Sequence, residues 1–179
     1  ENIKDKIKNN LTVIVYNFVD MLSHSKTEME IIKELASNDK GYRDLTLSWF
    51  KNSPLFEIIR KGQENGFKLI ITTDHGTINV KTPSKIIGDR ETSQNLRYKT
   101  GRSLTFNDKD VVSFHNPGNI FLPNVSINSS YVFAKENTYL VYPNSYNYYV
   151  NYFRDTYQHG GISLEEMIIP FAVLTPKPK

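Results

Sequence analysis

The chain has 179 residues, of which 39% are hydrophobic and 23% are charged, a composition typical of soluble globular domains. This length predicts one domain, or the larger part of one, with a sizeable core. The absence of cysteine excludes disulfides, thiolate nucleophiles and zinc sites built on thiolates. A net charge of +3 is too small to indicate a nucleic-acid-binding protein by itself. No apolar stretch is long enough to predict membrane insertion, and the composition is compatible with a cytoplasmic location.

The first half of the chain predicts an alternation of strands and helices. Residues 11–19 form a β-branched and aromatic run typical of a strand that is buried on both faces. Helices are predicted next at residues 25–36, at residues 42–50 and at residues 53–66, the last with a serine N-cap followed by proline. Residues 67–73 then predict a second buried strand. The order strand, helices, strand is the pattern of a parallel α/β sheet.

The second half of the chain begins with a change in amino-acid composition. Residues 76–109 are polar and rich in glycine, lysine and arginine, and we interpret them as a hairpin-like excursion above the sheet. Residues 130–142 predict two short strands around a turn, and residues 145–157 predict an aromatic-rich helix. Ser163 is expected to begin a short helix in a capping box with Glu166, and the last strand follows this helix.

Three short motifs carry residues of the kinds that bind metal ions. They are Asp20 with His24 after the first predicted strand, Asp74 with His75 after the second, and His159 in a late His-Gly-Gly. Carboxylates and imidazoles are suitable ligands for Zn²⁺ or Mn²⁺. Open α/β sheets build their active sites in loops that follow strands. Each pair taken alone has an ordinary alternative, in which the aspartate caps a helix and the histidine lies in solvent.

Together the three motifs favour the metal interpretation, because histidine-bearing loops that each follow a strand or helix meet more often in metal sites than by accident. His115, in Ser-Phe-His-Asn-Pro-Gly, fits no such pattern and is interpreted as a loop histidine. The remaining alternative is an α/β binding domain without metal, which would require the three motifs to arise by chance.

The motifs Asp-x-x-x-His, Thr-x-Asp-His-Gly and His-Gly-Gly resemble the metal-binding motifs of the alkaline phosphatase superfamily. More narrowly, the chain resembles a PglZ domain, in particular that of response regulators of the type IX secretion system. The segments that carry this resemblance are NFVDMLSHSK, TTDHGTINV, NLRYKTGR and YQHGGISLEEMIIPFAVL. The resemblance implies an α/β fold with an alkaline-phosphatase-like open, mostly parallel sheet flanked by helices, and with an inserted basic hairpin-like segment.

The resemblance also implies a site with two metal ions, usually zinc. Asp20, His24 and His159 would hold one ion. Asp74 and His75 would hold the other, together with an aspartate and a nucleophilic threonine or serine from earlier in the fold. No such residues precede Glu1, so we expect residues 1–179 to be the C-terminal portion of one PglZ-like catalytic domain, without its N-terminal strands and without a receiver domain. We expect this portion alone to be inactive, and a companion fragment or a second copy in a homodimer to cover its apolar core.

The segment 85–109 is expected to lie near the substrate. Arg97, Lys99 and Arg102 alternate with Tyr98, so that cations and an aromatic ring can contact a phosphodiester and a base. The alternative is a solvated basic hairpin. The resemblance implies a phosphodiesterase for nucleotide-like or oligonucleotide substrates, within a cytoplasmic two-component response regulator. A second interpretation is a signalling module that metal stabilises and that acts through protein partners without turnover.

Overall fold

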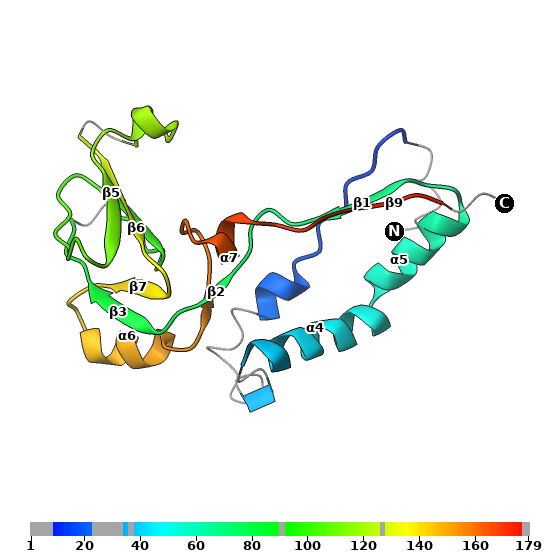
Figure 1. Cartoon of the computed structure of the whole chain (residues 1–179), viewed down its shortest axis with the longest axis horizontal. Helices are drawn as coiled ribbons and strands as arrows, with labels where there is room; N and C mark the ends of the chain where they lie inside the picture. The colour runs from blue at the N-terminus through cyan, green and yellow to red at the C-terminus, as the bar shows by residue number, and fades with distance from the viewer. Residues whose placement is uncertain (1–8, 23–33, 36–37, 90–91, 126–127, 177–179) are drawn as a thin grey trace.

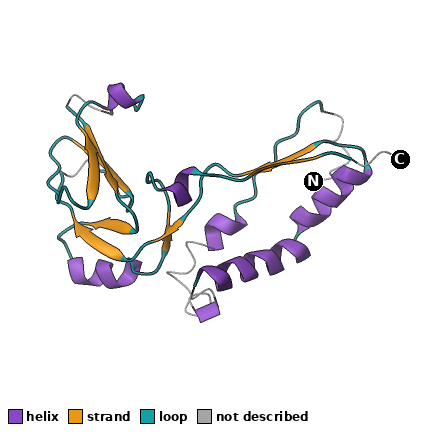
Figure 2. Cartoon of the chain, viewed as in Figure 1, coloured by secondary structure: helices purple, strands orange, loops and turns teal. Residues whose placement is uncertain are grey.

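The computed structural model describes residues 9–22, 34–35, 38–89, 92–125 and 128–176. These residues form two parts that lie side by side in Figure 1. One part, the β unit, consists of the described residues in the range 80–153 and contains most of the short strands. The other part contains two long helices beside a narrow two-stranded ribbon (Figures 1 and 2).

Helices α4 (Asp39–Asn52) and α5 (Pro54–Glu64) confirm two of the predicted helices. The side chains of Asn38 and Ser53 cap their N-termini by accepting hydrogen bonds from backbone amides. The helix predicted at residues 25–36 lies almost wholly outside the described residues. Among the helices that the structure describes, none is long and apolar enough to cross a membrane.

The ribbon consists of two antiparallel strand pairs in succession. β1 (Leu69–Thr72) pairs with β9 (Phe171–Leu174), and β2 (Ile78–Asn79) pairs with β8 (Tyr157–Gln158). β2 follows β1 along the chain and β8 precedes β9, so the two pairs continue one ribbon (Figure 1). β1 and β9 confirm the positions of the second and the last predicted strands. The predicted burial of the second strand is wrong, since three of the four residues of β1 are exposed.

The ribbon is interrupted between its two strand pairs. Residues 73–77 on one side and residues 159–170 on the other leave the antiparallel ladder. The longer side contains the predicted short helix, α7 (Leu164–Met167). His75 and His159 lie on opposite sides of this interruption.

The β unit contains a parallel pair and a separate three-stranded sheet. β3 (Thr82–Lys85) pairs in parallel with β7 (Thr138–Val141). β4 (Tyr98–Gly101), β6 (Ser130–Ala134) and β5 (Val111–Phe114) form an antiparallel sheet in the order β4-β6-β5. β6 and β7 confirm the two strands predicted around a turn. β4 pairs with β6 and therefore belongs to the sheet instead of lying above it.

The core of the β unit consists of two apolar clusters on the two sides of β7. Tyr139 and Val141 belong to one cluster, and Leu140, between them, belongs to the other. This alternation arises because successive side chains of a strand point to opposite faces. Helix α6 (Tyr146–Phe153), which confirms the predicted aromatic-rich helix, closes the first cluster through Val150. The other buried members are Ile78 and Val80 in the first cluster, and Ile86, Val111, Val132 and Ala134 in the second.

A mixed α/β fold is confirmed, but the open, mostly parallel sheet is not. Among the described residues the sheets have two or three strands, and β3 with β7 is the one parallel pair. The strand predicted at residues 11–19 is wrong, since residues 11–16 have no regular structure and residues 18–22 are helical. A β-branched run forms a strand only where a neighbouring edge pairs with it. Val13 and Val15 are instead 76% and 80% exposed.

Leu140→Ala should lower the free energy of unfolding by about 2–5 kcal/mol, because the fully buried side chain of Leu140 would leave a cavity in the second cluster. Leu47→Ala is the matched control. Leu47 is half exposed on α4, so its replacement should change the free energy of unfolding by less than about 0.5 kcal/mol. Urea unfolding followed by circular dichroism measures both variants. Equal effects would contradict the placement of the core.

Candidate metal centre

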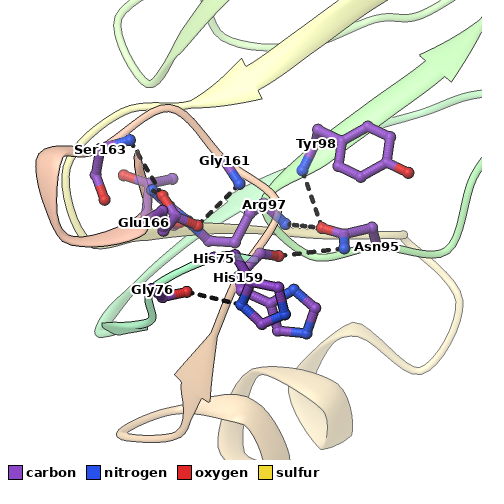
Figure 3. Close-up of polar contacts among 10 residues, drawn as sticks. His75, Gly76, Asn95, Arg97, Tyr98, His159, Gly161, Ser163 and Glu166 are labelled. Atoms are coloured by element: carbon purple, nitrogen blue, oxygen red, sulfur yellow. Dashed lines mark hydrogen bonds and ion pairs between the residues drawn. The ribbon is translucent and has the colours of Figure 1, made fainter. Parts of the chain in front are cut away.

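Three of the predicted ligands meet at the interruption of the ribbon. Asp20, His75 and His159 each offer a ligand atom, and these atoms all lie within 4.8 Å of one another. The imidazole rings of His75 and His159 are stacked, with centroids 3.8 Å apart and planes at 11° (Figure 3). Oδ1 of Asp20 lies 3.7 Å from Nε2 of His159. The fold thus brings one residue from each of the three motifs to one point.

The backbone beside His75 determines which ring nitrogen carries the proton. Nδ1 of His75 lies 3.1 Å from the carbonyl oxygen of Gly76. A carbonyl oxygen only accepts hydrogen bonds, so Nδ1 is the protonated nitrogen of the neutral ring. Nε2 then keeps its lone pair. Metal-bound histidines show the same arrangement, in which the second nitrogen donates to a carbonyl or carboxylate.

Aromatic contacts with α4 hold the segment that carries Asp20. Phe18 stacks on Trp49 with ring centroids 3.9 Å apart, and the hydroxyl of Tyr42 donates to Val19 O at 3.2 Å. Burial, together with the nearby Asp20 carboxylate, raises the pKa of Tyr42 to about 12. This hydroxyl therefore keeps its proton, and remains a hydrogen-bond donor, throughout the neutral range.

The same tyrosine also holds the strand that leads to His159. The ring of Tyr42 stacks on that of Tyr157, with centroids 4.4 Å apart. The hydroxyl of Tyr157 donates to the carboxylate of Asp39 at the start of α4. Tyr157 lies two residues before His159. Helix α4 therefore positions two of the three ligands, one through Val19 O and one through Tyr157.

Asp74 lies beside the cluster but outside it. Its Oδ1 is 3.7 Å from Nε2 of His75, and its side chain is 87% exposed. A hydrogen bond from its own backbone amide, followed by the charge of His75, lowers the pKa of Asp74, so its carboxylate is ionised at neutral pH. His24 lies outside the described residues, and its part in the site stays a prediction.

The four predicted substrate contacts divide between the inside and the outside of the β unit. Arg97 and Lys99 are 0% and 1% exposed, Tyr98 is half-buried and Arg102 is exposed. Tyr98 and Lys99 divide by alternation along β4, because every second side chain points into the unit, and Arg97 and Arg102, which flank the strand, continue the alternation. The two buried cations contact protein groups in this structure, and Arg102 and Tyr98 are the members nearer to solvent.

Glu166 is a site residue that the sequence indicated only as a partner in a capping box. Its Oε2 does accept a hydrogen bond from Ser163 N at 3.2 Å. Its two carboxylate oxygens also accept hydrogen bonds from Nε and Nη2 of Arg97, each at 2.9 Å. Burial by itself would raise the pKa of Glu166, but the hydrogen bonds and charge of Arg97 outweigh it and lower the pKa. No motif indicates this pairing, because the two residues are far apart in the sequence.

A cleft of about 790 Å³ extends from the ribbon to the start of α4. Thr77 and Ile162, which continue the two histidine loops, contribute to its lining. The lining also contains the cations Arg43 and Lys81, together with the acidic residues Asp39, Glu136 and Glu165. The cleft therefore lies next to the histidine loops and carries charges of both signs.

Residues 3–174 match the family model described as the BREX system PglZ alkaline phosphatase-like domain. The chain belongs to the PglZ family. This membership suggests a phosphoesterase-type function, and it confirms the family that the motifs indicated. The narrower similarity to response regulators is not confirmed. No curated protein sequence matches the chain.

The side-chain types of the cluster suit the metal ions that alkaline-phosphatase-like folds typically use. Two imidazoles and one carboxylate are a common ligand set for zinc. Two ligands with bonds of about 2.1 Å to one zinc ion lie at most about 4.2 Å apart. Ligands around a tetrahedral zinc ion lie closer, about 3.4 Å apart, so ligand atoms of Asp20, His75 and His159 that lie up to 4.8 Å apart would need to approach by up to about 1.4 Å. The two stacked rings would also need to turn so that their nitrogens point at one ion.

The burial of Lys99 predicts a dependence of stability on pH. Nζ of Lys99 lies 4.2 Å from the centroid of the Tyr142 ring, and burial lowers the pKa of Lys99 to about 8. Lysine in an unfolded chain has a pKa of about 10.4, so between pH 8 and pH 10 the unfolded state binds more protons. The folded state therefore becomes more stable as the pH rises through this range.

Between pH 7 and pH 10, the wild-type protein should gain about 1–3 kcal/mol in free energy of unfolding relative to Lys99→Met, whose side chain does not titrate. Urea unfolding of both proteins at each pH measures this difference, in which all other titrating groups cancel. A difference that is independent of pH would contradict the burial of Lys99.

Proposed function

We propose that this domain is a zinc-dependent phosphodiesterase that acts on nucleotide-like or oligonucleotide phosphodiesters. The observation that carries the proposal is the cluster of Asp20, His75 and His159 in a chain of an alkaline-phosphatase-like family. Two imidazoles and a carboxylate suit zinc, the metal that the resemblance implies. In the proposal, Asp74 is a ligand of a second ion, and His24 completes the set of the first.

Bound zinc would neutralise charge on the phosphoryl group and on the attacking and leaving oxygens. The role of the protein is to position the ligand side chains. The hydrogen bond to Gly76 O orients the ring of His75 with Nε2 unprotonated. The ionised Asp74 offers a second carboxylate at the same edge. The nucleophile in this proposal is a threonine or serine hydroxyl supplied by residues other than those of the cluster.

The cleft beside the histidine loops supports a substrate of moderate size. Its volume of about 790 Å³ lies in the range of pockets that bind small ligands, about 300–1,000 Å³. Arg43 and Lys81 in its lining provide cations for phosphate oxygens. Arg102 and Tyr98, toward the outside of β4, stay proposed contacts for a longer nucleotide chain, with Arg97 and Lys99 buried beneath them.

The same proposal places the domain in a cytoplasmic response regulator of type IX secretion, supported by the similarity of the four sequence segments. The family match names the BREX system instead, and the proposed chemistry holds in either setting. Apolar side chains at Leu11, Val13, Ile70 and Phe171 are exposed, which supports a partner that covers them. In the proposal this partner is the N-terminal portion of the same domain or a second copy.

His75→Ala and His159→Ala should each abolish stoichiometric zinc binding, because each removes a ligand of the cluster. His115→Ala is the matched control, since His115 is an exposed loop histidine outside the cluster. Elemental analysis after dialysis against micromolar zinc measures metal content. Full zinc occupancy in either ligand variant would refute the site.

Turnover of a nitrophenyl phosphodiester tests the enzyme assignment. The assay requires a form of the protein that includes the proposed threonine or serine nucleophile. Hydrolysis that depends on His75 and His159 supports the proposal. Zinc binding without hydrolysis in that form would instead favour a metal-stabilised module that acts through protein contacts.

Zinc affinity and hydrolysis should both fall below about pH 6, because protons compete with zinc for imidazole nitrogens. With two histidine ligands, the affinity should fall by about 100-fold for each further pH unit once both rings are protonated. Chelator-competition titrations between pH 5 and pH 8 measure this slope. An affinity that does not change over the range would contradict histidine ligation.

A further inference from the structure

A buried ion pair lies beside the two histidine loops (Figure 3). Arg97 and Glu166 are 0% and 3% exposed. Nε and Nη2 of Arg97 donate to the two oxygens of Glu166, each at 2.9 Å, and Nη1 donates to Thr138 O. Such paired hydrogen bonds fix both side chains in one geometry. Arg97 therefore offers no surface to a substrate in this structure.

Glu166 contacts both histidine loops. Its main-chain oxygen accepts a hydrogen bond from Gly76 N at 2.9 Å, and Gly76 directly follows His75. Its carboxylate oxygen Oε1 accepts a hydrogen bond from Gly161 N at 2.9 Å, and Gly161 lies two residues after His159. One residue thus connects the two sides of the interruption in the ribbon.

Asn95 provides a second connection, on the side of Arg97. Its Nδ2 donates to His159 O at 3.2 Å. Its Oδ1 accepts hydrogen bonds from the backbone amides of Arg97, at 2.7 Å, and Tyr98, at 3.2 Å. The loop is therefore held at the carbonyl group of His159 and, two residues later, at the amide group of Gly161. Arg97 is bonded to the side chain that makes each contact, Asn95 in the first and Glu166 in the second.

The glycines of the two motifs are required by these close contacts. A Cβ atom on Gly76 would lie 2.0 Å from Glu165 O, and one on Gly161 would lie 2.6 Å from Oε2 of Glu166. Gly160 has a φ of +99°, in the region that favours glycine. The sequences His-Gly and His-Gly-Gly thus belong to the same arrangement as the ion pair.

We propose that the Arg97–Glu166 pair is a positioning device that sets the separation of His75 and His159 and thereby the zinc affinity of the site. This inference rests on the proposed zinc site. The two residues act through the backbone of the loops and contact neither metal nor substrate. Ligands that are misplaced by about 1 Å hold a metal ion poorly, so the contacts around a site control its affinity.

Glu166→Gln keeps the size of the side chain but removes its charge, and Arg97→Lys keeps the charge but loses the paired hydrogen bonds. Each should lower the zinc affinity of the folded chain by about 10- to 100-fold, the range for groups that orient metal ligands. Chelator-competition titration with zinc alone measures this. Glu57→Gln is the matched control, because it breaks an exposed 2.8 Å pair with Arg60 on α5 and should leave zinc affinity unchanged.

Two further variants separate positioning from folding. Asn95→Ala removes the contact with His159 O at a half-buried position, so it tests the same device even where the ion-pair variants fail to fold. It too should weaken zinc binding. Leu140→Ala destabilises the core without contacting either histidine loop, and its folded form should bind zinc with wild-type affinity.

The outcomes are distinguishable. Wild-type zinc affinity in Glu166→Gln and Arg97→Lys, or in Asn95→Ala where those do not fold, would overturn the positioning role and leave the metal site intact. Failure of the wild-type chain to bind zinc would overturn the proposed function together with this inference. A rise in KM in Arg97→Lys with unchanged zinc affinity would also overturn the positioning role and assign Arg97 to substrate binding.

Discussion

The antiparallel pairing of residues 69–79 with residues 157–174 is the constraint on which the candidate site depends. Strand pairs close the ribbon at both ends of its interruption, so the two histidine loops cannot separate without breaking one of them. His75 and His159 face each other because their loops are the two sides of this interruption (Figure 3). The candidate site is thus formed without the open parallel sheet that the resemblance led us to expect.

The ribbon alone has little apolar packing to hold this geometry. Neither α4 nor α5 contains a buried residue, and all four residues of β9 are exposed. The β unit, by contrast, contains both apolar clusters apart from Ile78, which belongs to β2 of the ribbon. Arg97 belongs to this unit, since its carbonyl oxygen accepts from Ala134 N at 2.8 Å, whereas Glu166 belongs to the interruption. Their ion pair therefore connects the loops to the part of the molecule with a packed core.

Short sequence patterns predicted the nearby structure well. Ser53 followed by proline marked the start of α5, and the three motifs named residues that do meet in space. The grouping of the ligands was not predictable. We expected His75 to pair with Asp74 on one ion, but the structure stacks it on His159 beside Asp20. That arrangement depends on strand pairing between segments far apart in the chain, for which periodicity provides no register.

The same limit explains Arg97 and Lys99. A period of two places both on one side of a strand-like segment but does not say which side is inside. Because buried charges are costly, cations are assigned to solvent from the sequence alone. The Glu166 carboxylate and the Tyr142 ring offset that cost. A buried pair of charges contributes little net stability, because desolvation cancels much of the attraction. In the proposed positioning role, the pair fixes the place of the histidine loops. Because Glu166 neutralises Arg97, the pair does so without an uncompensated positive charge beside the proposed metal site.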